Sequence, residues 1–399
     1  MIRPLLSLVM MVKDEAASIR GVLEAAKPFV DRWTILDTGS TDGTQDIIRE
    51  VMADKLGRLV EEPFIGCSFA PNIIDFAATR NRVLALDSAY EPAVFQLMLS
   101  GDEFLDCGAE LREHLQQHRD SDVDLHFVCV YLESTLSPQP RVFRTGSEWR
   151  YKDELHEYPV HPDPEAKKVS VPMARIQHVV SDPERRYAAI WEKHIPVLKH
   201  KLEENENDER ALMYLAQSYE TLLPFFSEAE KLMYSLEAMG LCLRRLAITT
   251  GSDIERSYIQ LMYLDFAQST GIFTAGELYN RAKALVETCP RPEAALLLAQ
   301  LSARAVEATE VYSHAAAAAK MADEALAQKT DTSPLSMAIA WQAHHFAAVV
   351  ARQLKAKRPL FEDWGAKMRM HIAAGLAAGG SWDLFKQLDA PLESKEATP

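Results

Sequence analysis

The amino-acid pattern changes character near residue 185, and this change constrains the fold more than any other feature of the chain. Before it, short apolar runs alternate with segments whose apolar residues recur at helical spacing, which is typical of a parallel α/β sheet. After it, helical patterns follow one another almost without a strand. We therefore predict an α/β domain over residues 1–185, an all-α domain over residues 186–390 and a flexible tail at 391–399.

The expected strands are short and apolar. They lie at residues 5–12, 33–36, 59–60, 94–99, 125–131 and 141–143. In the helical half, three segments resemble one another, at residues 212–218, 261–269 and 295–301. Helix pairs that repeat with a period of about 34 residues are typical of tetratricopeptide (TPR) arrays. The spacing here is irregular, so a TPR-like array and a plain helical bundle both stay open.

The composition sets outer limits on function. The 399 residues include 43 Lys+Arg and 58 Asp+Glu, a net charge of −15, which argues against a general binder of polyanions. The five cysteines are widely spaced and form no C-x-x-C pair, so neither a disulfide framework nor a zinc motif is indicated. No apolar run approaches the roughly 18–20 residues that span a bilayer. We expect a cytoplasmic protein without a membrane span.

A polar turn follows the second expected strand. Residues 37–44 read D-T-G-S-T-D-G-T, which places carboxylates and hydroxyls at the carboxyl end of a parallel strand. Open α/β sheets bind their ligands at that edge. Such residues also form ordinary turns and helix caps, so the segment alone does not decide between a binding loop and a structural turn.

Three further segments accompany this turn in the same order along the chain. Residues 12–15 read V-K-D-E, residues 76–81 read F-A-A-T-R-N and residues 100–103 read S-G-D-E. Together with residues 37–44 they resemble the V-K-N-E, D-T-G-S-T-D-x-T, F-x-x-A-R-N and D-A-D-E motifs of family 2 glycosyltransferases. The resemblance covers roughly residues 4–180. It implies a GT-A fold, with a Rossmann-like, mostly parallel sheet, and transfer of a sugar from a nucleotide-diphosphate sugar, by default a UDP-sugar.

The resemblance also implies a donor site. Asp37 would accept the ring N–H of the base, and Arg80 would lie near the base or the phosphates, where a guanidinium suits phosphate oxygens. The remaining expected donor-binding residues are Met11, Val12, Lys13, Glu15, Gly101 and Asp102.

The leaving group of such a reaction is a nucleoside diphosphate, whose developing charge calls for Mn²⁺ or Mg²⁺ held by hard ligands. In the family, a D-x-D motif supplies them. Here Ser100 replaces the first Asp, whereas Asp102 occupies the place of the direct metal ligand. His178 lies where some GT-A enzymes carry a late metal-binding histidine. Loss of the first carboxylate puts tight metal binding in doubt.

The catalytic candidates come from residues 153–157. Leu155-His156-Glu157 resembles the V-H-E triplet of family members. Inverting transfer needs a base that takes the acceptor's proton. Glu157 is the first choice, with Asp153 and Glu154 as alternatives, and His156 as a base or a metal ligand.

The acceptor is less constrained than the donor. Relatives with this two-part layout modify peptides, proteins or surface glycans, and the helical domain would select the acceptor or form a homodimer. One alternative is a glycosyltransferase for hydroxymethylated bases of phage DNA, which the negative net charge disfavours. Another is a non-catalytic scaffold, which the Ser100 replacement keeps open. A nucleotidyltransferase is disfavoured because residues 12–15 are neither Gly-rich nor strongly basic.

Overall fold

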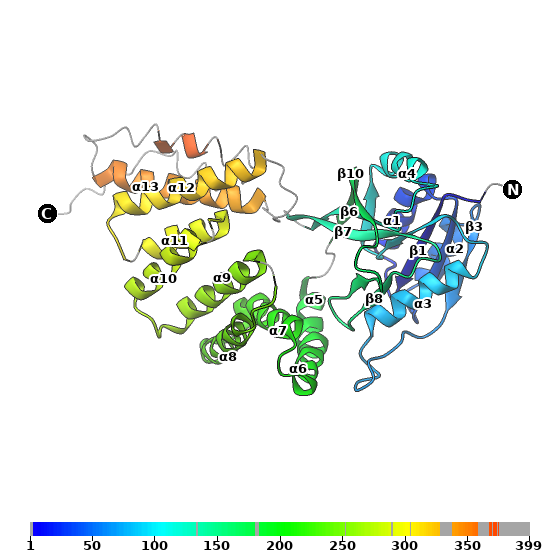
Figure 1. Cartoon of the computed structure of the whole chain (residues 1–399), viewed down its shortest axis with the longest axis horizontal. Coiled ribbons are helices and arrows are strands. Elements are labelled where there is room, and N and C mark those ends of the chain that lie inside the picture. Colours follow the sequence, from blue (N-terminus) through cyan, green and yellow to red (C-terminus); the bar gives the residue numbers. More distant parts are fainter. Residues whose placement is uncertain are drawn as a thin grey trace. The chain divides into compact units, whose positions relative to one another are not determined.

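The computed structural model forms two compact units, residues Met1–Arg186 and Tyr187–Pro399 (Figure 1). It describes residues 3–132, 135–179, 183–251, 253–288, 290–303, 305–327, 337–357, 367–368, 370–372 and 374. The expected flexible tail at 391–399 lies outside these residues.

The first unit is built on an eight-stranded sheet, counted over the described residues, with the order β3-β2-β1-β4-β7-β6-β10-β5. Its strands are β1 (Leu6–Val12), β2 (Arg32–Asp37), β3 (Leu56–Glu61), β4 (Phe95–Leu99), β5 (Glu103–Asp106), β6 (Leu125–Leu132), β7 (Thr135–Arg144) and β10 (Lys168–His178). The β3-β2-β1-β4 half is entirely parallel, whereas β7 runs antiparallel to both of its neighbours. The sheet is therefore mixed and mostly parallel.

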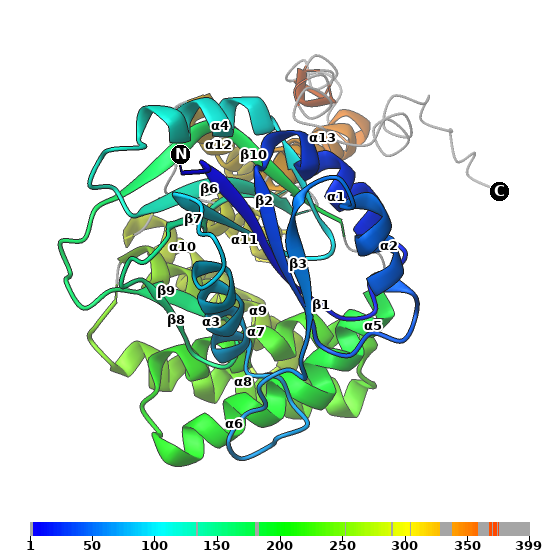
Figure 2. The ribbon, with the colours of Figure 1, turned by 90° about the vertical axis from the view of Figure 1, so that its right-hand side faces the viewer.

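Two hydrophobic cores sandwich this sheet because alternate side chains of a strand point to opposite faces. On one face, Leu8 and Met10 of β1 pack with α1 (Ile19–Ala26), α2 (Thr44–Val51) and α4 (Gly108–Gln117). On the other face, Val9 packs with α3 (Phe76–Ser88) and with Tyr151 of the small β8–β9 sheet. Figure 2 shows α3 on one side of β1–β3, with α1 and α2 on the other.

Four strands were not expected from the sequence. They are β5, β10, β8 (Arg150–Lys152) and β9 (Tyr158–Val160). The β8 and β9 strands have three residues each, too few for an alternating pattern. The β10 strand pairs with β6 and β5, but its register shifts between Ser170 and Arg175. Such a bulge breaks the period of two on which strand prediction depends.

The second unit is helical throughout its described residues. Its elements are the end of α5 (Pro183–Ala189), a π-helical turn at Ile190–His194, α6 (Ile195–Glu204), α7 (Glu209–Leu222), α8 (Glu228–Ala247), α9 (Asp253–Thr270), α10 (Ala275–Thr288), α11 (Pro292–Ser302), α12 (Ala308–Ala327) and α13 (Met337–Lys357). From α6 to α13 each helix packs on the next one along the chain. This confirms the predicted fold class, an α/β unit with a mostly parallel sheet followed by a helical unit. No helix within the described ranges is long and apolar enough to cross a membrane.

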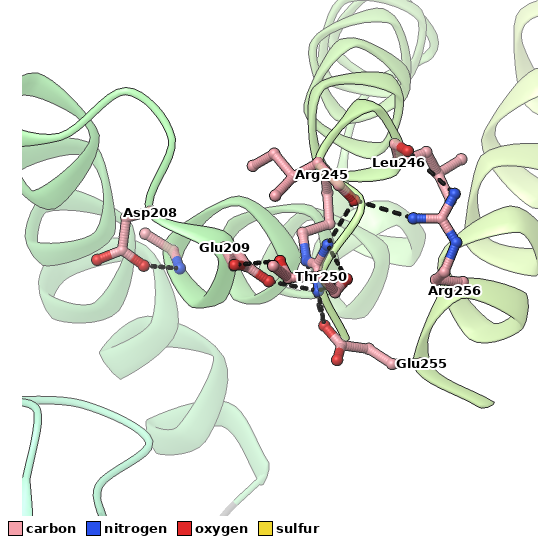
Figure 3. Close-up of polar contacts among 9 residues, drawn as sticks. Asp208, Glu209, Arg245, Leu246, Thr250, Glu255 and Arg256 are labelled. Carbon is pink, nitrogen blue, oxygen red and sulfur yellow. Dashed lines mark hydrogen bonds and ion pairs between the residues drawn. The ribbon is translucent and has the colours of Figure 1, made fainter. Parts of the chain in front are cut away.

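A buried arginine links three successive helices of this array (Figure 3). Arg245, near the end of α8, is only 1% exposed and lies 2.7 Å from Glu209 of α7 and 2.7 Å from Glu255 of α9. It also donates to the backbone carbonyl of Thr250. Arg256 of α9 donates to the carbonyls of Leu246 and Ile248, where α8 ends. The guanidinium groups thus satisfy carbonyls that a helix end leaves without partners.

Candidate functional site

The candidate site lies at the carboxyl edge of the parallel strands. Val12 at the end of β1 is in register with Asp37 at the end of β2, and Met10 is in register with Leu99 of β4. The three strands therefore end side by side, and the expected donor-binding loops follow them directly. Met11 and Val12 are the last residues of β1, and Met11 packs against the α3 side of the sheet.

Asp37 is buried and its two carboxylate oxygens differ. Oδ1 accepts hydrogen bonds from the backbone N–H groups of Gly39 and Ser40, each at 2.9 Å, and from Nε2 of Gln45 at 3.0 Å. Oδ2 is buried and has no hydrogen-bond partner. A buried acceptor without a partner costs free energy in the isolated protein, and a ligand N–H would satisfy it.

The loop after β1 is held against the loop after β2. The backbone N–H of Asp14 donates to Oγ of Ser40, and that of Glu15 donates to Oγ1 of Thr44. In return Oδ1 of Asp14 accepts from the N–H of Thr41 at 2.8 Å. Asp14 adopts a left-handed conformation with φ 54°, which is uncommon for a residue other than glycine. Hydroxyls of the D-T-G-S-T-D-G-T turn thus fix both loops.

Lys13 and Gly101 lie beside this pair of loops. The ammonium of Lys13 is 5.6 Å from the centre of the Phe64 ring, within cation–π range. A Cβ at Gly101 would lie 2.5 Å from Cγ of Glu15, so only glycine allows Glu15 to pack against the loop after β4. Two of the expected donor-binding residues are therefore in direct contact.

Asp102 and His178 come together although they are 76 residues apart in the sequence. Nε2 of His178 lies 3.0 Å from Oδ2 of Asp102, and both side chains are partly exposed. The hydrogen bond to Asp102 raises the pKa of His178 above its usual value. The structure brings these two expected metal ligands together because β10 ends next to β5, the strand that follows Asp102.

Asp102 and His178 meet the requirements of a divalent cation only in part. Carboxylate oxygen and imidazole nitrogen both suit Mn²⁺, and two adjacent ligands at ~2.1 Å from an octahedral ion lie ~3 Å apart. The described residues contain no group of three or more His, Cys, Asp or Glu side chains that could hold a metal. Asp102 and His178 alone therefore do not form a metal site, and a cation held by them would need further ligands from elsewhere.

Glu103 is not available as a ligand. Its carboxylate is buried, accepts from the backbone N–H of Ser100 at 2.9 Å and lies 2.5 Å from Nη2 of Arg141. This ion pair holds the loop that carries Asp102. Arg141 belongs to β7, and its pairing with Glu103 was not expected from the sequence.

Arg80 forms a buried ion pair with the first-choice catalytic residue. Its Nε donates to Oε1 of Glu157 at 2.6 Å, and the side chains are 9% and 16% exposed. Burial lowers the pKa of Arg80, but Glu157, Tyr151 and Glu103 together more than offset this effect, and the pKa is above its usual value. The Nη1 of Arg80 is buried without a hydrogen-bond partner. Glu157 is therefore bound to a cation, and Arg80 keeps one donor free.

Asn81, the last residue of the F-A-A-T-R-N segment, has a structural role. Its side chain donates to the carbonyl of Tyr151 at 2.8 Å and accepts from the N–H of Tyr151 at 2.9 Å. This two-way bond fixes β8 against α3, and the Tyr151 ring lies 5.6 Å from the Arg80 guanidinium. The N–H of Phe76 also donates to the carbonyl of Glu154. Helix α3 thus positions the segment that follows β8.

Asp153 and His156 lie in that segment, between β8 and β9. Both adopt left-handed backbone conformations, with φ 74° and 53°. Such conformations cost about 1 kcal/mol or more outside glycine and gather at functional sites. Both side chains are partly exposed. All four catalytic candidates therefore belong to one loop, residues 153–157, which α3 holds in place.

A basic stripe that includes Arg144 and Arg150 would favour a DNA acceptor, and both side chains have partners within the protein. Arg144 pairs with Asp124 at 3.0 Å and donates to the carbonyls of His118 and Arg119, where α4 ends. Arg150 donates to the carbonyls of Ser147 and Trp149. Both arginines thus donate to the protein's own backbone. The side chains of Arg185 and Arg186 lie outside the described residues.

Comparisons with known proteins give limited information. No family model matches the chain. A TPR repeat-containing protein of Synechococcus elongatus is 30% identical over 158 residues, which are 38% of this chain and 34% of that protein. The chain thus spans about a third of the length of this relative.

Among solved structures, a mannosyltransferase of Pyrobaculum calidifontis in complex with GDP-Man and Mn²⁺ is 14% identical to this chain. The match covers 90% of this chain and 88% of that protein, with a TM-score of 0.34. That score is too low to support fold or function, so the fold class above rests on the strand order.

Proposed function

We propose that the first unit is a glycosyltransferase of the family 2 type, which binds a nucleotide-diphosphate sugar at the carboxyl edge of β1, β2 and β4. One observation carries the proposal. Asp37 is held through Oδ1 by its own turn, while the buried Oδ2 has no partner. An acceptor in this position suits the ring N–H of a nucleobase.

The chemistry of Asp37 selects among bases. Uracil and guanine each carry a ring N–H next to a carbonyl, which a carboxylate oxygen can accept. The corresponding ring nitrogens of cytosine and adenine carry no hydrogen and would face the carboxylate with a lone pair. We therefore expect UDP or GDP to bind, with UDP as the default, and CDP and ADP to bind weakly.

Asp102 and His178 would hold Mn²⁺ or Mg²⁺ together with the diphosphate. When bound, the cation supplies positive charge that offsets the charge developing on the leaving diphosphate. With Ser100 in place of a carboxylate, the protein offers one fewer anionic ligand. Binding of cation and nucleotide should therefore depend strongly on each other.

Glu157 and its neighbours divide the remaining roles. Because Oε1 of Glu157 accepts from Nε of Arg80 at 2.6 Å, we assign Glu157 to positioning Arg80 toward the phosphates. Asp153 or His156 then takes the acceptor's proton as the acceptor oxygen attacks the anomeric carbon with inversion. We propose a peptide, protein or glycan as acceptor, selected with the help of the helical unit.

The test is calorimetric binding of UDP, GDP, CDP and ADP, each with and without Mn²⁺, to the wild type and to Asp37→Asn. The asparagine keeps an oxygen for the N–H groups of Gly39 and Ser40 but places an NH₂ where Oδ2 lies. We expect the affinity for UDP or GDP to fall about tenfold or more, with an unchanged thermal midpoint.

Asp102→Asn is the second arm of this experiment. It should abolish the gain in affinity that Mn²⁺ provides and leave metal-independent binding in place. A well-folded wild type that binds none of the four nucleotides would overturn the proposal and favour a scaffold in which the donor site has decayed.

A further inference from the structure

Helix α8 (Glu228–Ala247) carries an apolar seam on its solvent-facing side. Exposed apolar residues follow one another along the helix with the spacing four, three, four, three, four. They are Ala229, Met233, Leu236, Gly240, Leu243 and Ala247. This is the heptad spacing of a coiled-coil seam, in which two positions in every seven face a partner helix. The 20-residue helix makes the seam about 30 Å long.

The seam is separate from the face that builds the core of the second unit. On its buried side α8 packs against α7 and α9 through residues such as Ala238, Leu241 and Cys242. On the seam, Met233 is 51% and Leu243 is 52% exposed, and Leu232 borders it at 43%. Three large exposed apolar side chains on one stripe, Met233, Leu236 and Leu243, differ from the scattered single ones of an ordinary surface.

Gly240 has no explanation within one copy of the chain. It lies inside a long helix, where glycine is less favourable than alanine, and its φ is not in the left-handed region. A Cβ added there would meet no atom within 4 Å. A glycine in an open place on an apolar seam leaves room for a large side chain that arrives from outside.

The seam is complementary to itself in one arrangement. In this arrangement the helices are antiparallel, and a two-fold axis crosses the seam at the height of residue 238 along the helix. It puts Ala229 opposite Ala247, Met233 opposite Leu243 and Leu236 opposite Gly240 of the second copy. Each large residue at the centre then meets the glycine of the other copy, and each end has two small residues in contact. A closed dimer with two-fold symmetry needs such a self-complementary surface.

Neighbouring features favour the same pairing. Leu243 and Leu246 line one side of a pocket of about 370 Å³, completed by Tyr263 of α9 and Leu285 of α10, among others. The Met233 side chain of the second copy would arrive beside this pocket. Glu230 and Arg244 are both exposed on the same flank of the seam, and the antiparallel pairing brings each within about one turn of its opposite charge. Glu237 lies between them near the axis, where Lys199 at 3.3 Å offsets its charge.

We propose that this protein forms a two-fold symmetric homodimer through antiparallel contact of the α8 seams. The proposal concerns the second unit and is independent of the donor site. Because one pair of helices makes only a small interface, we expect the dimer to exchange with monomer at micromolar concentrations.

The test uses the full chain and sedimentation velocity from about 1 to about 100 μM. The wild type should shift from monomer to dimer over this range. Met233→Glu and Leu243→Lys should each raise the dissociation constant about thirtyfold or more, because each places two unpaired charges in the seam. Ile272→Lys removes an equally exposed apolar side chain elsewhere in the unit and should leave the dimer unchanged.

Mixing the two charged variants tests the arrangement itself. In a heterodimer, Glu at position 233 of one copy faces Lys at position 243 of the other, while the second such pair keeps its native residues. Association should therefore return in the mixture at concentrations where each variant alone is monomeric. Dimers of the wild type without any rescue in the mixture would contradict the antiparallel register.

Gly240→Gln is a control that separates a loss of dimerisation from a loss of folding. The larger helix-forming residue fits the isolated copy, so the thermal midpoint of the monomer should stay or rise, whereas the space for Leu236 of the second copy is filled and dimerisation should fall about tenfold or more. A wild type that stays monomeric throughout the range, or a dimer that Gly240→Gln and both charged variants leave intact, would overturn the proposal.

Discussion

The Nε of Arg80 lies 2.6 Å from Oε1 of Glu157, and the two residues are 77 positions apart in the sequence. Both side chains are largely buried, so the pair joins α3 to the loop after β8 across the candidate site. The neighbouring Glu103 carboxylate also contributes to the raised pKa of Arg80, which places a second ion pair, Glu103–Arg141, close to the first. The site is thus organised by charges that satisfy one another before any ligand binds.

Arg80→Met should destabilise the first unit by about 3 kcal/mol, because it leaves the Glu157 carboxylate buried without its cation. The double variant Arg80→Met/Glu157→Met should recover part of this loss, since no unpaired charge remains. Chemical denaturation, with hydrogen exchange of the α3 amides as the readout, measures the stability of both variants. The neighbouring Arg82, paired with Glu62 at the surface, supplies the control: Arg82→Met should leave the free energy of unfolding close to that of the wild type.

Gly101→Ala should weaken nucleotide binding more than it weakens the fold. The added Cβ would lie 2.5 Å from Cγ of Glu15, so the two loops must move apart. We expect about a tenfold loss of nucleotide affinity by calorimetry and a stability loss of about 1 kcal/mol. Gly276→Ala, in the first turn of α10 with no atom near its added Cβ, should leave both quantities close to wild type. Equal affinity in both variants would show that the contact between Glu15 and Gly101 does not shape the nucleotide site.

The first unit should lose stability in mild acid because of His126. Its ring is fully buried, lies 3.1 Å from Nε2 of His114, and has a pKa lowered to about 3 by burial and by the nearby charges of His114, His118 and Arg144. Below pH 6.5, the usual pKa of histidine, His126 of the unfolded chain binds a proton. In the folded unit His126 stays neutral down to about pH 3. Stability is therefore full above pH 6.5 and falls as the pH drops toward 3, by up to about 1.4 kcal/mol per pH unit.

Hydrogen exchange in β6, compared at pH 7 and pH 5 after correction for intrinsic rates, isolates this effect from the second unit. The wild type should lose about 2 kcal/mol between the two values. The His126→Phe variant should lose much less stability between pH 7 and pH 5. Any change in packing that the substitution causes affects both pH values equally, because each variant is compared with itself. His200→Gln, in α6, should retain the wild-type difference. An equal loss in His126→Phe would assign the acid sensitivity to other groups.

Arg245→Met should loosen the second unit locally. The variant removes the cation that lies 2.7 Å from Glu209 and 2.7 Å from Glu255, together with its bond to the carbonyl of Thr250. Because both glutamates are about one-third exposed, water offsets part of the loss, and we expect a destabilisation of about 2 kcal/mol. The measurement is hydrogen exchange at the ends of α7, α8 and α9, with the exposed Lys283→Met as control. Unchanged protection there would mean that packing alone fixes these helices.

Much of the site could be placed from the sequence because it follows local patterns. Apolar runs bounded by polar turns marked β1, β2 and β4, and the carboxyl ends of parallel strands meet at one edge. Asp37, Gly101 and Asp102 could therefore be expected at that edge. The assignment of their roles relied on motif resemblance and remains a proposal. The β10 strand was missed because its bulge interrupts the alternating pattern.

The sequence by itself determined the class of each half of the chain, since periods of two and of 3.6 are properties of neighbouring residues. Only the tertiary structure decided which charges meet: Arg80 with Glu157, Arg141 with Glu103, and His178 with Asp102. These pairs join distant segments, and nothing in local spacing indicates which of many carboxylates a given cation will reach. The α8 seam shows the same division. Its heptad spacing is present in the sequence, but a buried and an exposed seam have the same spacing, and only the packing of α7 and α9 on the opposite face left this one exposed.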